Sequence, residues 1–218
     1  MFVGHLAVSL AAKAVEPRAS LGALVAASFG LDLLWPILVL VGLETVSVAP
    51  GITAFTPLAF DSYPWSHSLL MACVWGAAAG SFMYWTSKRP RVAVLVGMVV
   101  LSHWLLDFAT HRADLPLWPG GPKYGMGLWN SISATIFVEG GLFVAAITMY
   151  IRAFKPCDAV GKWAFRVMVG LTGAVWIMQP WSPPPPSSNA VAAVALAMFA
   201  FPFWAAWIDC HRSTDGTV

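Results

Sequence analysis

Charged residues are scarce in this sequence. Only 10% of its 218 residues are Asp, Glu, Lys or Arg, against roughly 25% in an average soluble domain. Hydrophobic residues make up 59%, and the mean hydropathy is +0.73. So little charge excludes an ordinary water-exposed globular surface and predicts an integral membrane protein. No basic patch interleaved with aromatic residues exists either, so nothing indicates a nucleic-acid partner.

Cysteine is also rare, with three residues at positions 73, 157 and 210. Their separation excludes a zinc site built from closely spaced cysteines and gives no sign of a disulfide framework. We therefore expect free thiols. Any metal site must draw its ligands from other side chains.

What the sequence has in abundance is long apolar runs, most of them near the ~20 residues that cross a bilayer as a helix. They predict an all-α fold, a polytopic membrane helix bundle with about six transmembrane helices plus a short N-terminal helix. The whole chain, 1–218, is expected to be one membrane domain. The short helix is expected at 2–15, and the spans near 19–43, 64–86, 91–112, 129–151, 160–180 and 189–208. Proline and glycine predict irregular connections at 44–63 and 113–128, and an extended one at 181–189.

The basic residues predict the orientation. Ten of the twelve would lie on one side of such a bundle, in the turns at 13–18 and 87–91, the connection at 152–166 and the C-terminal tail. Basic loops face the cytoplasm. We therefore expect a multi-pass protein of the bacterial inner membrane, with its C-terminus in the cytoplasm and the long loops on the periplasmic side.

Ionisable residues interrupt the apolar runs. In SHWLLDFATH, His103, Asp107 and His111 are four residues apart and project from nearly one helix face. Depth from the basic side can be estimated by counting ~1.5 Å per residue from the nearest basic residue. It places ionisable groups from four segments in one slab, roughly 18–30 Å from that side. The other segments contribute Asp32, His67 and Glu139, and His5 in the short helix is the remaining candidate. Intramembrane ionisable residues are costly and usually functional. Imidazoles and carboxylates together suit zinc, and also manganese or iron.

These residues also carry a family resemblance. The order His5, Asp32, serine-flanked His67 and His103-x-x-x-Asp107 resembles the YdjM-like family of inner-membrane metal-dependent hydrolases. The resemblance covers residues 1–152, whereas 160–208 match only in hydropathy. That family is distantly similar to zinc-dependent phospholipase C. The resemblance implies that all five of these residues ligate metal.

The sequence departs from that pattern in three places, at Gly30-Leu31-Asp32, at Met1-Phe2 and at Thr135. These departures favour one or two divalent ions over three. His111 is a sixth candidate ligand because of its spacing from Asp107.

The resemblance predicts a membrane-embedded metal-dependent hydrolase of the phosphoesterase type, with a phospholipid or lipid-linked phosphoester of the outer leaflet as substrate. Asp107 and Glu139 are the candidate catalytic residues, each as a ligand or as the acceptor of a proton from water. Arg112, Lys123 and Asn130 are candidates to bind the lipid phosphate at the outer rim. Membrane lipid is the expected partner.

Three other functions are compatible with the same residues. A proton- or metal-ion-coupled transporter would relay its cargo through the buried acids and histidines. A haem protein would use His103 and a facing histidine as axial ligands. A non-catalytic subunit of a membrane complex would use the polar groups only to pack its helices.

Overall fold

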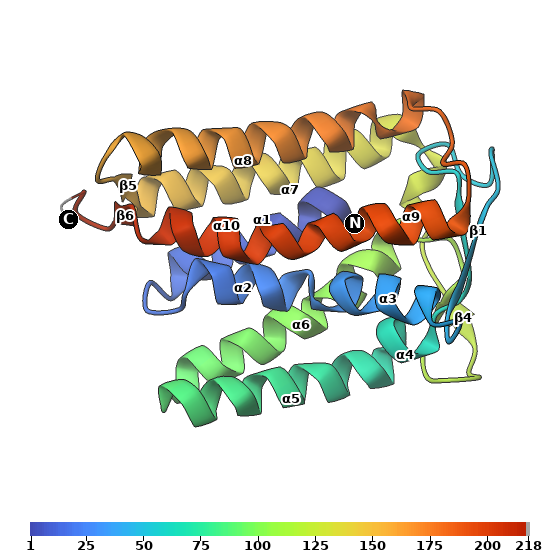
Figure 1. Ribbon diagram of the computed structural model, residues 1–218, viewed down its shortest axis with the longest axis horizontal. Coiled ribbons are helices and arrows are strands. Elements are labelled where there is room, and N and C mark those ends of the chain that lie inside the picture. Colours follow the sequence, from blue (N-terminus) through green and yellow to red (C-terminus); the bar gives the residue numbers. More distant parts are fainter. Residues whose placement is uncertain (217–218) are drawn as a thin grey trace.

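The computed structural model describes residues 1–216, and it is a bundle of helices that run along one long axis, with two hairpins and long loops at one end (Figure 1). The helices are α1 (Phe2–Val15), α2 (Leu21–Ser28), α3 (Gly30–Leu40), α4 (Pro64–His67), α5 (Leu69–Ser87), α6 (Pro90–Thr110), α7 (Ile132–Ala153), α8 (Ala159–Met178), α9 (Ser188–Ala195) and α10 (Ala200–Asp209). Short 3₁₀ turns are η1 (Leu128–Asn130), η2 (Gln179–Trp181) and η3 (Leu196–Phe199). The predicted all-α bundle is confirmed in this coarse form.

The short helix α1 is the centre of the bundle. Its apolar residues Val3, Leu6 and Leu10 are fully buried, and it packs against α7, α2 and α6. Figure 1 shows that it starts near the middle of the long axis, where the N-terminus is marked. At 14 residues it is too short to cross a bilayer. It therefore carries its first residues to the interior of the bundle.

The expected number of six membrane spans is not confirmed. In residues 1–216, four helical segments are long and apolar enough to cross a membrane, or five if α2 and α3 together form one bent span. The four are Leu69–Ser87, Pro90–Thr110, Ile132–Ala153 and Ser188–Asp209. The expected span near 160–180 does form a 20-residue helix, α8. However, Lys162 and Arg166 in its first half lower its hydropathy, so its crossing is not confirmed.

Two expected spans are broken, and both breaks lie beside candidate site residues. The run 19–43 bends by 50° between α2 and α3, at Phe29. The run 64–86 breaks at Ser68, whose extended backbone ends α4 directly after His67. The Ser68 side chain then accepts a hydrogen bond from the Met71 N–H and caps α5. Local capping chemistry thus turns one long apolar run into a short helix followed by a span.

Helices α5 and α6 approach each other closely because glycines face one another. A Cβ atom added at Gly97 would lie 3.0 Å from the carbonyl oxygen of Gly76, and one added at Gly80 would lie 3.0 Å from that of Ala93. Small residues permit such contact between membrane helices, where packing rather than the hydrophobic effect drives association. This contact fixes α6, which carries two of the candidate ligands.

The long loops contain more regular structure than the sequence predicts. Strands β1 (Thr45–Val48) and β2 (Leu58–Ser62) form an antiparallel hairpin within 44–63, and β3 (Leu115–Pro116) pairs with β4 (Lys123–Tyr124) within 113–128. At the opposite end, β5 (Lys155–Pro156) pairs with β6 (Arg212–Ser213) and ties the C-terminal tail to the α7–α8 turn.

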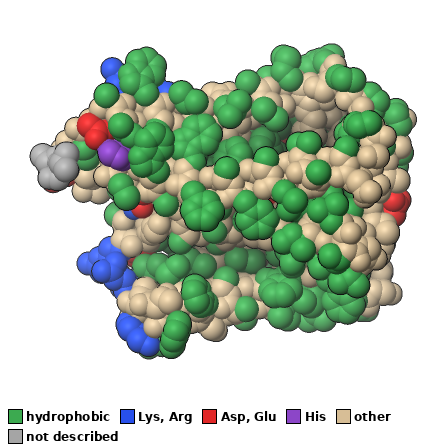
Figure 2. Space-filling view, in the orientation of Figure 1, with side chains coloured by type: hydrophobic (Ala, Val, Ile, Leu, Met, Phe, Trp, Pro, Cys, Tyr) green, Lys and Arg blue, Asp and Glu red, His purple; other side chains and the backbone are tan. Residues whose placement is uncertain are grey.

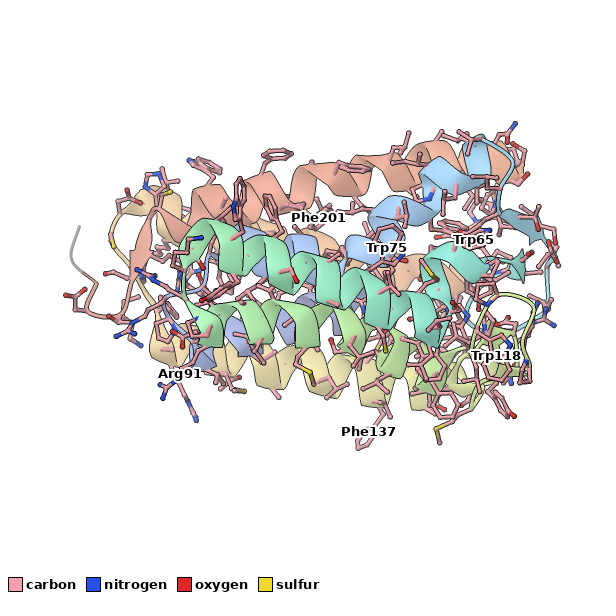
Figure 3. The ribbon with its side chains drawn as sticks, turned by 90° about the horizontal axis from the view of Figure 1, so that it is seen from below. Trp65, Trp75, Arg91, Trp118, Phe137 and Phe201 are labelled. Atoms are coloured by element: carbon pink, nitrogen blue, oxygen red, sulfur yellow. The ribbon has the colours of Figure 1, made fainter. Side chains whose placement is uncertain are left out.

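The two ends of the bundle differ in charge. On the face shown in Figure 2, Lys and Arg side chains gather at the end that holds the C-terminus, and hydrophobic side chains cover most of the rest. In Figure 3, Arg91 lies near this basic end, whereas Trp65 and Trp118 lie near the loop end. Between them, Phe137 points outward and is 83% exposed. This pattern is typical of a helical membrane protein.

Candidate metal centre

Five of the predicted ligands, which come from four helices, converge at one place inside the bundle. His5 comes from α1, Asp32 from α3 and His67 from the last position of α4, while His103 and Asp107 share one face of α6. His5 and His103 are fully buried, and only Asp32 has appreciable exposure, with 27% of its side chain accessible. Segments up to about a hundred residues apart in sequence therefore meet at one point.

The donor atoms form two groups that share His103, one of Asp32, His67 and His103 and one of His5, His103 and Asp107, with all donors of a group within 4.8 Å of one another. Nε2 of His67 lies 3.2 Å from Nε2 of His103 and 3.4 Å from Oδ1 of Asp32. Oδ2 of Asp107 lies 3.1 Å from the His103 nitrogen and 3.8 Å from the His67 nitrogen. Ligands about 2.0–2.1 Å from a tetrahedral zinc ion are separated by about 3.3 Å. The spacing around His103 is compatible with an ion in each group, whereas Asp32 and Asp107 belong to different groups.

The second oxygens of the two carboxylates face the third histidine. Nε2 of His5 lies 3.2 Å from Oδ1 of Asp107 and 3.9 Å from Oδ2 of Asp32. The His5 ring stacks on the His103 ring with centroids 3.7 Å apart. The amino group of Met1 donates to the same Asp107 oxygen at 2.5 Å. Each carboxylate therefore turns one oxygen toward His5 and the other toward His67 or His103, an arrangement in which it could bridge two ions.

A backbone carbonyl orients His103. Its Nδ1 lies 2.7 Å from the carbonyl oxygen of Ser28, next to the bend between α2 and α3. A carbonyl only accepts hydrogen bonds, so Nδ1 carries the proton and, in the neutral ring, Nε2 keeps its lone pair. This is the tautomer that a metal ligand needs, and metal-binding histidines are commonly held in this way.

A buried carboxylate orients His67 through a serine. Ser66 Oγ lies 2.7 Å from Nδ1 of His67 and 2.6 Å from Oε2 of Glu44. Oε1 of Glu44 accepts hydrogen bonds from the backbone N–H groups of Trp65 and Ser66, and Glu44 is 1% exposed. The hydroxyl therefore donates to Glu44 and accepts from His67, so that Nε2 of a neutral His67 also presents a lone pair.

Sequence reasoning missed Glu44. It lies directly after the apolar run 19–43, where an acidic residue predicts only a helix end, and Ser66 next to His67 indicates only a helix start. No local pattern connects two residues 22 positions apart, one in a loop and one in a four-residue helix. Only the folded loop brings them together.

His111 lies beside the cluster rather than within it. Its Nε2 is 4.0 Å from Oδ2 of Asp107, and its Nδ1 is 3.1 Å from Oδ1 of Asp114. Tyr63 also donates to that Asp114 oxygen. Burial alone would raise the pKa of Asp114, but hydrogen bonds from His111, Tyr63 and Arg112 outweigh it, and the pKa is lowered. Ionised Asp114 thus holds His111 with Nε2 turned toward Asp107.

Glu139 is fully buried on α7, outside the two ligand groups. Trp129 Nε1–H donates to its Oε1 at 3.1 Å, and its Oε2 has no hydrogen-bond partner among the described residues. The side chain lines the same cavity as Asp32, His67, Asp107 and His111. A carboxylate with one free oxygen is thus available beside the cluster.

The three expected phosphate-binding residues lie elsewhere. Arg112 is paired with Asp114 through its Nε at 3.0 Å, and Lys123 donates to the carbonyl oxygen of Asp61 on the exposed loop surface. Asn130 is exposed at the end of η1. None of the three lines the cavity beside the cluster. Their role in substrate binding remains a prediction.

That cavity has a volume of about 570 Å³, within the usual range for ligand sites. Its polar end holds Asp32, His67, Asp107, His111 and Glu139. Its other walls are almost entirely apolar and come from α3, α8, α9 and the outer loops. The cluster is therefore accessible from a mainly apolar space.

The residues fit a small metal ion. The two Nε2 atoms at 3.2 Å face each other with lone pairs, a repulsive contact unless a proton or a cation lies between them. Carboxylate oxygens of Asp107 and Asp32 lie 3.1 Å and 3.7 Å from Nε2 of His103, which favours an ion over a porphyrin between the rings. No protein-family model, curated protein or solved structure matches this chain.

Proposed function

We propose that this protein is a membrane-embedded metal-dependent hydrolase that cleaves a phosphoester of a phospholipid or lipid-linked substrate. The observation that carries the proposal is a pair of donor groups that share His103 in an apolar bundle, Asp32–His67–His103 and His5–His103–Asp107. The Met1 ammonium compensates Asp107, but burying a second carboxylate and three imidazoles at the same place is costly unless a further cation is present.

One ion would be held by Asp32, His67 and His103, and His5 and Asp107 would be the ligands of a second ion beside His103. Zinc suits this mixture of nitrogen and oxygen donors, and manganese or iron would also be accepted. A bound divalent ion supplies a Lewis acid for the phosphoryl oxygens and a water-derived nucleophile at neutral pH.

The two candidate catalytic carboxylates have different roles. Asp107 lies within 4.0 Å of four histidines and acts as a ligand, whereas Glu139 keeps a free oxygen. In hydrolysis, the oxygen of water bonds to phosphorus and the bond from phosphorus to the leaving alcohol oxygen breaks. Glu139 accepts the proton from water and returns it to the leaving oxygen. The apolar walls of the cavity exclude other water.

Orientation supports an outer-leaflet substrate. The cluster lies on the loop side of the chain's basic anchors, and the positive-inside rule assigns the basic end to the cytoplasm. The proposed enzyme therefore belongs to a bacterial inner membrane and acts on lipid from the periplasmic side.

The test is metal content together with activity. We expect the purified wild-type protein to retain one or two divalent ions per chain by elemental analysis, and His103→Ala and Asp107→Ala to lose them. His211→Ala is the matched control, because this histidine lies at the opposite end and pairs with Asp158. Wild-type protein should also hydrolyse a phospholipid or a lipid phosphate in a substrate screen, and Glu139→Gln should bind metal but lack this activity.

Two outcomes would contradict the proposal. Full metal retention by His103→Ala and Asp107→Ala would show that these residues do not bind the metal. Stoichiometric metal without hydrolysis of any lipid ester, combined with ion uptake into proteoliposomes, would favour a transporter.

A further inference from the structure

The cavity beside the cluster has a wall built by the C-terminal part of the chain. Residues from α8, α9 and η3 form it, namely Val175, Trp176, Val191, Val194, Ala195 and Met198. Helix α9 packs against α3, which carries Asp32 (Figure 1). The segment 160–208, which matches the resembled family only in hydropathy, therefore borders the site directly.

This wall favours a hydrocarbon chain and disfavours a strongly polar ligand. Among the described residues that line the cavity there is no Lys or Arg, the Met1 ammonium is already paired with Asp107, and every acidic or histidine side chain is at the cluster end. A large charged molecule would lose its hydration there without gaining a partner. A ligand with a long apolar part and one polar group at its end meets both ends of the cavity.

The cavity also reaches the outside of the bundle. Val194 lines it and is 74% exposed, so its apolar end opens on a surface of the apolar segment Ser188–Asp209. In a membrane, that surface faces lipid chains. The cavity volume of about 570 Å³ is that of a site for a single small ligand or lipid chain.

We infer that α8 and α9 form the binding wall for one acyl chain of a membrane phospholipid, whose head group lies at the cluster of Asp32, His67, His103 and Asp107. The inference deepens the proposed function, on whose site it rests, because it names the substrate class and the part of the chain that selects it. The small residues of α9 then set the length of the acyl chain that the protein accepts.

The test is photolabelling of the metal-free and metal-loaded full chain by a phosphatidylglycerol with a diazirine near the end of one acyl chain. We expect saturable labelling of the peptide that holds Val191, Val194 and Ala195. Labelling of the outward-pointing Phe137 on α7 provides the non-saturable background of surrounding lipid (Figure 3). Unlabelled phosphatidylglycerol should displace the α9 label several-fold more effectively than a polyprenyl phosphate.

Two variants on one helix supply the control. Ala195→Trp fills the cavity and should abolish the saturable label, whereas Ala193→Trp, on the exposed side of α9, should leave it unchanged. Both variants should bind as much metal as the wild type. If Ala195→Trp does not fold, Val191→Phe fills the same wall, and saturation in the wild type is still measurable.

The outcomes separate this inference from the proposed function. Equal, non-saturable labelling of α9 and α7, or an unchanged label in a folded Ala195→Trp variant, would overturn the acyl-chain site. Preferential displacement by polyprenyl phosphate would overturn the choice of an acyl chain. Saturable labelling of α9 in a protein that never binds metal would support the acyl-chain site and contradict the proposed metal-dependent hydrolase.

Discussion

At the residue scale, the orientation of each imidazole decides whether a metal can bind. His103 and His67 each use Nδ1 for a hydrogen bond within the protein and turn Nε2 toward the carboxylates. The partner of His103 is a backbone carbonyl, which no side-chain substitution removes. The partner of His67 is the Glu44–Ser66 pair, which substitution can remove without touching a ligand.

We therefore predict that Ser66→Ala and Glu44→Gln weaken metal binding by about 10–100-fold, the usual effect of losing an orienting partner. Competition with a chelator measures the affinity, and thermal unfolding of the same samples reports stability. Ser20→Ala is the control, because this serine caps the start of α2, away from His67. It should cost about 1 kcal/mol through the lost cap but leave the metal affinity unchanged. An equal loss of affinity in Ser20→Ala would show that the effect is general destabilisation.

At the element scale, the site depends on helices that are interrupted or tightly packed. The bend at Phe29 and the break at Ser68 bring Asp32 and His67 to the same level as α6. The contact between Gly76 and Gly97 then fixes α6 against α5.

A larger side chain at this contact should disturb the site from a distance. Gly97→Val would place its Cβ 3.0 Å from the Gly76 carbonyl oxygen, and overpacking of this kind costs about 1–3 kcal/mol. We expect a lower melting temperature and weaker metal binding, because Gly97 and His103 are on one helix. Gly141→Ala is the control, since a Cβ there meets nothing within 4 Å. Equal melting temperatures of Gly97→Val and the wild type would contradict the importance of the contact.

At the scale of the whole molecule, the difference in charge between the two ends predicts the orientation in the membrane. The basic end holds Cys210, which is exposed, and the loop end holds the exposed Asp61. We predict that a membrane-impermeant maleimide labels Asp61→Cys in sealed spheroplasts, and labels Cys210 only after the membrane is opened. Mass spectrometry of the labelled peptides distinguishes the two sites. Labelling of Cys210 in sealed spheroplasts would reverse the orientation and move the site to the cytoplasmic side.

The sequence by itself determined the membrane class, the apolar helices and most of the candidate ligands. These follow from composition and from the four-residue spacing of His103 and Asp107, which are local properties of the chain. Only the tertiary structure decided that α1 lies at the centre, that two runs are broken, and that His5, Asp32 and His67 reach the same point as α6. It also decided the role of Glu44 and the apolar wall from α8 and α9. Contacts between distant segments depend on how helices pack and loops close, and no hydrophobic period along the chain records them.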